Sequence, residues 1–444
     1  MNVLPPLMEK NTQLPVQSLP EVHASVQVPH GAGFWRKLWA FTGPGLMVAV
    51  GYMDPGNWAT DIAGGARFGY TLLSVILLSN LFAMLLQHLA LKLGIATGLD
   101  LAQACRQHYS HPTVLVLWVL CQVAIVACDL AELLGSAIAL HLLFGIPMSV
   151  GVVITVLDVL AIMYFQGRGF RVLESIVGSL ILVIFACFAY EIVASKPDMR
   201  QVVTGLVPQP DILTNPSMLY VAIGILGATV MPHNLYLHSS IVQTRAYERN
   251  ASGKGMAIRF ATIDSTVSLF LAFFINAAIL IISAAVFHFS GNQHVADIMD
   301  AHQLLNPILG VKWASILFAV ALLASGQNST LTGTLAGQIV MQGFLNLQIK
   351  PWLQRLLTRL TAVVPALIVT LLYGDRGTSE LLVLSQVILS LQLSFAVVPL
   401  VLFTSNKTKM GAFVNSGWLT MLSWIVTIVI IVLNGYLLWD TLFS

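Results

Sequence analysis

Two short segments that lie far apart in the chain each combine a potential ligand with a proline and an asparagine. The first, residues 51–57, reads GYMDPGN, and the second, residues 228–234, reads ATVMPHN. Both follow one order: a small residue, two further residues, the ligand, proline, one residue and asparagine. Because proline removes a backbone donor and clashes with the preceding turn, it interrupts a helix when it lies inside one. Each segment is therefore expected to place a ligand side chain at a helix break.

Facing each other, the two breaks would form a cation site. Their side chains supply the Asp54 carboxylate, the Asn57 amide oxygen and the Met231 thioether. Backbone carbonyls freed around Gly51 and Ala228 would add further oxygen ligands. Neither segment carries a fixed positive charge that could bind a carboxylate substrate.

The mixture of ligand types selects among cations. Oxygen ligands alone suit Mg²⁺, Ca²⁺ or Na⁺, whereas a soft thioether favours later transition metals. An oxygen-rich shell with one sulfur is expected to take Mn²⁺ or Fe²⁺, to admit Co²⁺ and Cd²⁺, and to disfavour Ca²⁺. The alternative role of Met231 is packing, the usual role of a methionine in a core.

A second set of residues could handle protons. His233 directly follows the second Met-Pro pair, and an unperturbed histidine pKa of about 6.5 suits proton exchange near neutral pH. Asp129 and Glu132 are three residues apart in one apolar segment, so a helix would place them on one face. Two buried carboxyl groups this close disfavour double ionisation. Arg245 could offset one of these charges, and a static Asp129–Arg245 ion pair is the competing interpretation.

The elements that must position these residues are membrane helices. The chain has 444 residues, of which 57% are hydrophobic and only 9% charged, whereas soluble domains carry about 25% charged residues. This composition excludes a soluble enzyme, a disordered protein and a nucleic-acid binder that depends on a basic surface. The four cysteines have no metal-site spacing and are expected to be small buried side chains.

Eleven apolar segments predict an all-α polytopic membrane protein of about 11 transmembrane helices. They lie near residues 43–67, 71–93, 112–144, 148–165, 170–194, 217–245, 261–288, 312–345, 355–373, 379–403 and 414–438. Most of the 21 Lys and Arg residues fall on the side of the membrane that holds the N-terminus. The positive-inside rule then predicts a multi-pass protein with its N-terminus cytoplasmic and its C-terminus outside. Asn-x-Ser/Thr sequons at Asn250, Asn328 and Asn406 all fall at predicted cytoplasmic or membrane positions, which agrees with a protein of the bacterial inner membrane.

The paired breaks, five segments apart, indicate an inverted-repeat transporter. Unwound backbone is tolerated at membrane depth only where it lines a cavity or is buried by protein. We therefore predict a flexible cytoplasmic tail over residues 1–41, a first repeat over 42–195 and a second over 217–404. The segment 414–438 is an additional span outside the repeat.

Other polar residues in the apolar segments carry less information. Asp61, Asp158 and Asp264 each cost roughly 2.5–3.5 kcal/mol at the centre of a bilayer unless they face water, an ion or a partner. For Asp158 and Asp264, a functional role and a structural one, as an ion pair or as a residue near a helix end, are equally open.

Three histidines, His288, His294 and His302, lie with Asp297 and Asp300 between the seventh and eighth segments. Their spacing matches no ligand motif, so a solvated outer loop is expected.

The residues around both breaks resemble those of the Nramp family of proton-coupled divalent-metal transporters, in its bacterial manganese-transport branch. The resemblance rests on DPGN at 54–57 and MPHNLYLHS at 231–239. It continues through GPG at 43–45, GQNS at 326–329 and SQV at 385–387, and so covers nearly the whole chain. The family implies a LeuT-like 5+5 inverted-repeat fold, with helices 1 and 6 unwound at mid-membrane. It also implies symport of Mn²⁺ or Fe²⁺ with protons by alternating access.

The resemblance also implies a ligand set. The metal would be held by the side chains of Asp54, Asn57 and Met231 and by the Ala228 carbonyl, with Gln386 joining in some states. Gly51 stands where relatives often have alanine, a change that spares the carbonyl ligand.

A proton route is implied beside the metal route. It would run along Asp129 and Glu132 with Arg245 as a partner, and Arg355 and Arg359 are further candidates. Cys128 stands before Asp129 where relatives often have threonine, so a hydroxyl role there is lost.

Two other function classes compete with this interpretation. A sodium-coupled amino-acid or amine transporter would explain the breaks but not Met231. A membrane-embedded metalloenzyme would need clustered histidines, whereas His233 and His238 diverge by about 140° on a helix. We expect divalent metal ions, protons and the lipid bilayer as partners, and no resident cofactor, nucleic acid or obligatory protein partner.

Overall fold

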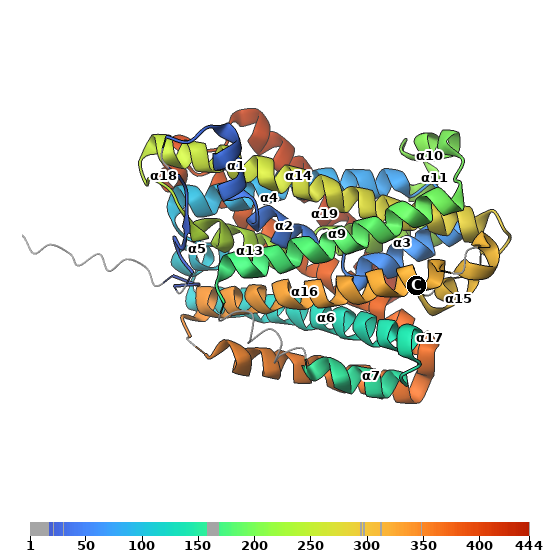
Figure 1. Ribbon diagram of the computed structural model, residues 1–444. Coiled ribbons are helices and arrows are strands. Elements are labelled where there is room, and N and C mark those ends of the chain that lie inside the picture. Colours follow the sequence, from blue (N-terminus) through green and yellow to red (C-terminus); the bar gives the residue numbers. More distant parts are fainter. Residues whose placement is uncertain are drawn as a thin grey trace, which may run out of the picture.

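The computed structural model describes residues 17–20, 22–29, 31–157, 168–293, 295, 298–310, 313–347 and 349–443. Over these residues the chain is a bundle of helices with one short two-stranded sheet (Figure 1). Within the described part, eight helical segments are long and apolar enough to cross a membrane, and two shorter apolar helices accompany them. The prediction of an all-α polytopic membrane protein is confirmed.

The first half of the chain contains the following elements: β1 (Val26–Gln27), α1 (Phe34–Phe41), α2 (Pro44–Val50), α3 (Pro55–Phe68), α4 (Leu73–Thr97), α5 (Leu101–His108), α6 (His111–Phe144), α7 (Met148–Ile154), η1 (Thr155–Leu157), α9 (Phe170–Ser195), α10 (Met199–Gly205) and α11 (Asp211–Thr214). The fourth predicted segment, near 148–165, is described only as far as Leu157, so Asp158 lies outside the described residues.

The second half contains α12 (Pro216–Thr229), α13 (Pro232–Ile241), η2 (Val242–Thr244), β2 (Arg245–Ala246), α14 (Ala251–Ser283), the π-helix η3 (Ala284–His288), α15 (Ile298–Leu309), α16 (Ala314–Leu345), α17 (Pro351–Thr404), α18 (Lys407–Met410), η4 (Gly411–Phe413) and α19 (Gly417–Phe443). Within α17, Gly374 has a left-handed backbone (φ 63°, ψ −148°) that separates the ninth predicted span from the tenth.

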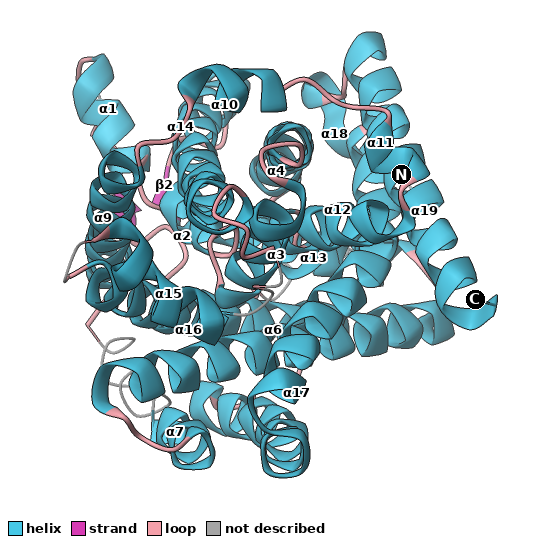
Figure 2. Cartoon of the chain, turned by 90° about the vertical axis from the view of Figure 1, so that its right-hand side faces the viewer, coloured by secondary structure: helices cyan, strands magenta, loops and turns pink. Residues whose placement is uncertain are grey.

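Both predicted helix breaks are present. The first separates α2 from α3, where Asp54 caps the N-terminus of α3 and Pro55 is its first residue. The second separates α12 from α13, where Val230 and Met231 have non-helical backbones and Pro232 begins the new helix. Proline suits this first position because its missing N–H would have no helical partner there. Figure 2 views the helices from their ends and shows α3 and α13 in the middle of the bundle.

Glycines let the helices around these breaks approach closely. A Cβ atom at Gly94 of α4 would lie 2.1 Å from the backbone carbonyl oxygen of Ser239 in α13. A Cβ atom at Gly45 of α2 would lie 2.7 Å from the backbone carbonyl of Asp264 in α14. Small residues at helix contacts are the usual means of tight packing in membranes, where apolar burial gives little net drive between helices.

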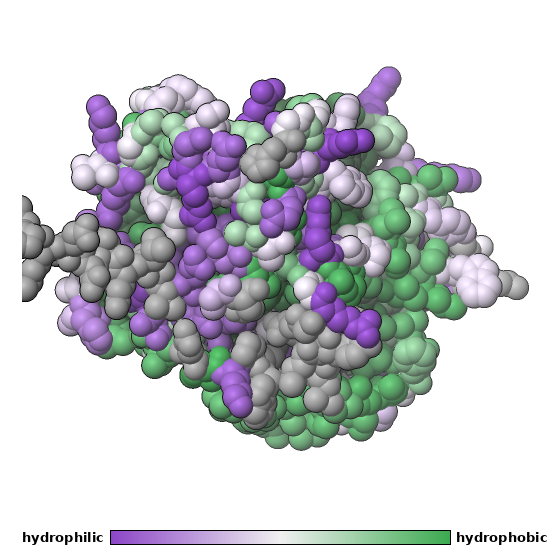
Figure 3. All heavy atoms as spheres, turned by 60° about the vertical axis from the view of Figure 1, so that its left-hand side comes forward, coloured by the Kyte–Doolittle hydropathy of each residue, from purple (hydrophilic) through white to green (hydrophobic). Residues whose placement is uncertain are grey.

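The N-terminal region differs from the predicted flexible tail over residues 1–41. From residue 17 onward the described residues pack against the bundle: Ser18 and Leu19 are buried, β1 pairs with β2 in parallel, and α1 follows. The Ala24 N–H also donates to the Gln243 carbonyl at 3.1 Å. Backbone pairing with a segment 219 residues away cannot be recognised in a local composition. Figure 3 shows many hydrophilic side chains toward this end of the molecule, whereas hydrophobic side chains gather at the lower right of that view.

The close approach of α4 and α13 generates a testable prediction. In Gly94→Ala the new methyl group meets a backbone carbonyl that cannot rotate away, so the variant is expected to lose about 1–3 kcal/mol of stability, as overpacked cores do. Gly178→Ala in α9 is the matched control, because its Cβ would find only Leu46 Cδ1 at 3.8 Å. Thermal unfolding of the two purified variants, followed by intrinsic fluorescence, would measure the difference. Equal melting temperatures would contradict this packing.

Candidate metal site

The two helix breaks meet at the Asn57 side chain. Its terminal amide lies 2.6 Å from Asp54 Oδ1 and 3.3 Å from the carbonyl oxygen of Ala228. In one orientation of the amide the NH₂ group donates to both oxygens. In the other orientation the amide oxygen joins them, and three acceptors converge from the start of α3 and the end of α12. Converging oxygens of this kind are the ligands that hard and borderline cations take in proteins.

Asp54 is held by the helix that it caps. Its Oδ1 accepts the Asn57 backbone N–H at 2.9 Å, as an N-cap aspartate does. The side chain is fully buried, and its Oδ2 has no hydrogen-bond partner among the residues that the structure describes. A buried carboxylate oxygen without a partner is costly, so this atom is available to a cation or a proton.

Met231 brings sulfur to the same level of the bundle. It is fully buried and is the N-terminal flanking residue of α13, directly before Pro232. Its side chain packs in one cluster with Ala124, Ala127, Cys128 and Leu389. The thioether therefore lies between α6, α13 and α17, and not on the lipid-facing surface.

Gln386 of α17 lies against the first break. A Cβ atom at Gly56 would be 1.7 Å from Gln386 Nε2, so the amide touches the backbone between Asp54 and Asn57. Its Nε2 donates to Ser385 Oγ at 3.1 Å, and its Oε1 has no partner. The described geometry thus brings a third helix and another amide oxygen to the Asp54–Asn57 segment.

Gly51 leaves room for a neighbouring side chain. A Cβ atom there would lie 2.0 Å from Asn234 Nδ2, so alanine at this position would require Asn234 to move. Asn234 is the asparagine that ends the second motif, and within the described part of the chain neither of its amide atoms has a hydrogen-bond partner. The two motifs therefore contact each other here as well as at Asn57.

A polar chain leads from Met231 to the buried acids of α6. Cys128 Sγ donates to Glu132 Oε1 at 3.5 Å and lies 3.7 Å from His233 Nε2. All four cysteines are buried and free, as predicted. Cys128 has a more specific place than the sequence indicated, because it links the second break to Glu132.

Arg359 is the cation beside the two acids. Its Nη1 lies 3.7 Å from Glu132 Oε2 and 3.9 Å from Asp129 Oδ1, and all three side chains are buried. Like charges at Asp129 and Glu132 are thus offset by a guanidinium that remains protonated. The side chain of Arg355 lies outside the described residues.

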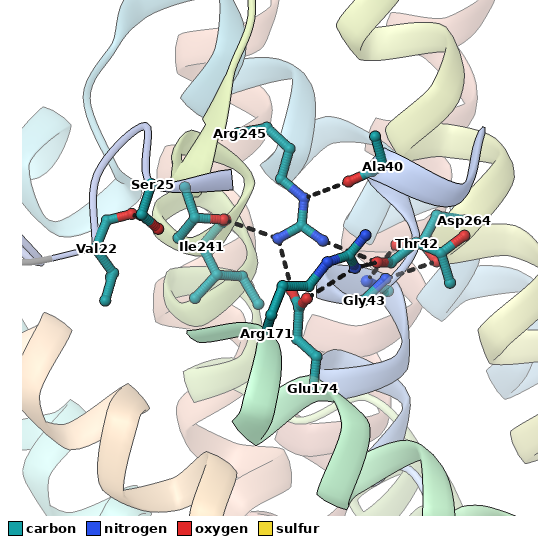
Figure 4. Close-up of polar contacts among 12 residues, drawn as sticks. Val22, Ser25, Ala40, Thr42, Gly43, Arg171, Glu174, Ile241, Arg245 and Asp264 are labelled. Atoms are coloured by element: carbon teal, nitrogen blue, oxygen red, sulfur yellow. Dashed lines mark hydrogen bonds and ion pairs between the residues drawn. The ribbon is translucent and has the colours of Figure 1, made fainter. Parts of the chain in front are cut away.

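The predicted partnership of Arg245 with Asp129 is wrong. Arg245 Nη1 instead lies 2.6 Å from Glu174 Oε1 of α9, and its other nitrogens donate to the carbonyls of Ala40 and Thr42 at 3.1 and 2.8 Å (Figure 4). The physical reason is position along the bundle: Arg245 follows α13 and lies in β2 at one end of the molecule, whereas Asp129 lies in the middle of α6.

Glu174 was missed by the sequence reasoning. It stands inside the apolar segment 170–194, so the cost of burying its charge was a usable signal. Arg171, three residues earlier, lies 3.0 Å from the same carboxylate. This partner could have been recognised from the spacing in the sequence. Nothing local pointed to Arg245, which is 71 residues away.

For Asp264 the sequence left a functional and a structural role open, and the structure shows a structural one. Its carboxylate accepts the backbone N–H of Gly43 at 3.3 Å and that of Gly45 at 2.7 Å, so it caps the N-terminus of α2 from α14 (Figure 4). A carboxylate at this end also complements the helix dipole. Asp61 lies seven residues after Asp54 on α3; it is buried, and its Oδ2 has no partner.

The predicted solvated loop between the seventh and eighth spans is wrong for two of its histidines. His288 ends the π-helix η3, and its Nδ1 lies 3.0 Å from the Ala66 carbonyl oxygen. His302 lies in α15. His294 and Asp297 are outside the described residues.

Among the residues that the structure describes, no three His, Cys, Asp or Glu side chains converge as a metal cluster. At the first break, one carboxylate, two amides and a backbone carbonyl lie together, and the Met231 thioether lies in the neighbouring cluster with Cys128 and Leu389. These donor types differ from the clustered histidines or carboxylates of a catalytic metal centre.

Known proteins resemble the chain over nearly its full length. A sequence model of the Nramp family, described as natural resistance-associated macrophage protein-like, matches residues 45–440. The divalent metal cation transporter MntH of Nostoc sp. is 62% identical over 427 residues, which cover 96% of this chain and 97% of that protein. The protein of the same name from Listeria monocytogenes is 63% identical over 427 residues, covering 96% and 95%.

Solved structures agree with the helix arrangement. The manganese transporter of Eremococcus coleocola superimposes with a TM-score of 0.88 at 43% identity, covering 94% of this chain and 90% of that one. The transporter MhsT superimposes with a TM-score of 0.58 at 14% identity, covering 88% and 98%. The second likeness concerns the fold alone, and it confirms the predicted LeuT-like architecture. On the extent and identity of these matches, the chain belongs to the Nramp family.

Proposed function

We propose that this chain takes up Mn²⁺ together with protons across the bacterial inner membrane by alternating access, and that Fe²⁺, Co²⁺ and Cd²⁺ also enter. The observation that carries the proposal is the meeting of Asp54, Asn57 and the Ala228 carbonyl where two interrupted helices face each other. Relatives at 61–63% identity are named divalent metal cation transporters. The chain is a multi-pass membrane transporter and not an enzyme.

The donor set supports a transition metal as the transported ion. Asp54 supplies one negative charge, Asn57, Gln386 and Ala228 supply neutral oxygens, and Met231 supplies sulfur. A single charge and a mixed shell bind a divalent ion without the closed geometry of a permanent site, as release requires. Sulfur adds little for Ca²⁺, so selectivity against that ion depends on Met231.

Proton coupling is supported by the polar chain beside the metal site. When the metal leaves, Asp54 accepts a proton. Beyond it, His233 contacts Cys128, and Cys128 contacts Glu132 one turn further along α6. Arg359 stabilises the Asp129–Glu132 pair whenever one of these groups is ionised. The proton route thus runs along α6, separate from the path of the metal between the broken helices.

Alternating access requires one end of the bundle to open while the other closes. The Arg245–Glu174 ion pair and the Asp264 cap join α2, α9, α14 and β2 at the end that carries the N-terminal residues. We place this end in the cytoplasm, with residues 42–195 and 217–404 as the two inverted repeats. Release of metal to the cytoplasm then requires these contacts to separate.

Replacement of the sulfur ligand tests the selected ion. In liposomes with an inward proton gradient, the unaltered protein is expected to take up Mn²⁺ and Cd²⁺ but little Ca²⁺. Met231→Ala is expected to reduce Cd²⁺ uptake by about tenfold or more and to admit Ca²⁺, since even a lost outer-shell group costs roughly 10–100-fold in metal affinity. Met47→Ala, which shortens an equally buried methionine in α2, is the control for loss of packing.

Two outcomes would contradict the proposal. If both methionine variants change uptake of the three ions alike, sulfur does not select the ion. If the unaltered protein moves no divalent metal at all, an organic substrate replaces the metal as the better candidate.

Replacement of one acid tests the proton route. Glu132→Gln keeps the size of the side chain and removes its charge, so we expect proton entry to fall while metal uptake continues, measured together with a pH-sensitive dye and a metal indicator inside liposomes. Glu191→Gln in α9 is the control, because Glu191 is also a buried carboxyl group but does not belong to the polar series of His233, Cys128 and Glu132. Unchanged proton entry in Glu132→Gln would leave the Asp129–Glu132–Arg359 cluster as a purely structural ion pair.

A further inference from the structure

Helix α1 exposes aromatic side chains on one side and packs on the other. Trp35 is 78% exposed and Trp39 is 75% exposed, and they lie one helical turn apart. On the opposite side Phe41 is buried and stacks on Phe260 of α14, with ring centroids 5.8 Å apart. Tryptophans exposed in this way are typical of a helix that lies in the headgroup region of a membrane.

The exposed side of α1 borders a groove of about 590 Å³. Its walls come from β1 and the residues just after it, from α1 and from the first turn of α9: Val26, Gln27, Pro29, Trp35, Arg36, Trp39, Ala40 and Arg171. Arg171 is fixed at the inner wall, because its guanidinium donates to the carbonyls of Trp39 at 2.7 Å and Thr42 at 2.5 Å. Arg36 is exposed and completes the positive side of the groove.

The groove has an excess of positive charge. Among the described residues that line it, none is acidic. Arg171 is paired with Glu174, but Glu174 also pairs with Arg245, so one carboxylate is shared between two guanidinium groups. Lys37, the next residue of α1, lines a different groove that includes Glu248. The two neighbouring basic residues therefore face different electrostatic surroundings.

The depth of the groove matches the phosphate level of a bilayer. Arg171 is the second residue of α9, a membrane-spanning helix of which only 33% of the apolar window is buried in the protein. Val172 is 38% exposed just beyond it, at the start of the lipid-facing surface of α9. A molecule with a negative headgroup and an acyl chain would place its headgroup at the arginines, its middle part beside the tryptophans and its acyl chain along the apolar surface of α9.

We propose that this groove binds an anionic phospholipid of the adjacent leaflet. Its phosphate lies between Arg36 and Arg171, and its glycerol and acyl chains run past Trp35 and Trp39 along α9. The bound lipid holds α1 in place. It thereby supports the carbonyls of α1 and Thr42 to which Arg171 and Arg245 donate. This site does not depend on which ion the protein transports.

The two neighbouring basic residues provide a matched test. Binding of phosphatidylglycerol to the purified full-length protein would be titrated by native mass spectrometry, for the unaltered protein, Arg36→Gln and Lys37→Gln. Each variant loses one positive charge from the same helix. Arg36→Gln is expected to weaken binding about fivefold, because it removes an exposed ion pair with the lipid phosphate, which contributes up to about 1 kcal/mol. Lys37→Gln is expected to leave the affinity unchanged.

A second measurement reports where the lipid lies. Brominated phosphatidylglycerol should quench tryptophan fluorescence in the unaltered protein, and the quenching should fall in Trp35→Phe, which keeps an aromatic ring. Equal weakening in Arg36→Gln and Lys37→Gln would overturn the proposal in favour of unspecific charge attraction. If phosphatidylcholine at equal concentration competes with phosphatidylglycerol, the groove does not select an anionic lipid, and the proposal is wrong. Binding of glycerol 3-phosphate as tightly as the lipid would make it a pocket for free anions.

Discussion

The structure depends on one constraint: backbone that leaves the helix at membrane depth must be covered by other protein. Around residues 51–54 and 230–231 the chain exposes carbonyl and amide groups that lipid cannot satisfy. Each break is covered by the other, through Asn57 beside the Ala228 carbonyl and Asn234 beside Gly51. Where the two breaks meet, Asp54 Oδ2 and Gln386 Oε1 have no hydrogen-bond partner among the described residues, so the arrangement that buries the breaks also leaves oxygen atoms available at the candidate site.

Two buried arginines pair with acidic side chains in two different parts of the bundle. Arg359 lies beside Glu132 and Asp129 in the middle of the bundle, where it offsets charge near the candidate proton route. Arg245 lies with Glu174 at one end, where it binds carbonyls at the junction of α1 and α2. Buried ion pairs contribute little net stability but are strongly destabilising when one partner is removed. A network of this kind suits an end of the molecule that must exist in two discrete arrangements.

The N-terminal residues connect this network to the membrane surface. β1 adds a strand to β2 directly at Arg245, and α1 leads into the capped start of α2. Because Arg171 and Arg245 donate to carbonyls at the junction of α1 and α2, a displacement of α2 would be transmitted to α1 and to the basic groove beside it. A few hydrogen bonds to backbone carbonyls thus connect this groove with the helix that ends at the first break.

The sequence by itself determined the membrane helices, both breaks and the candidate ligands at them. These features are local: apolar length, proline within a span, and a ligand beside it act over a few residues. Only the tertiary structure decided the partners. Arg245 pairs with Glu174, and Arg359 lies beside the acids of α6. Asp264 caps α2, and the described residues between 17 and 41 pack against the bundle instead of forming a tail. In a bundle, residues tens to hundreds of positions apart meet at one level. Charge pairing at that level is governed by depth and helix neighbours, which no local pattern encodes.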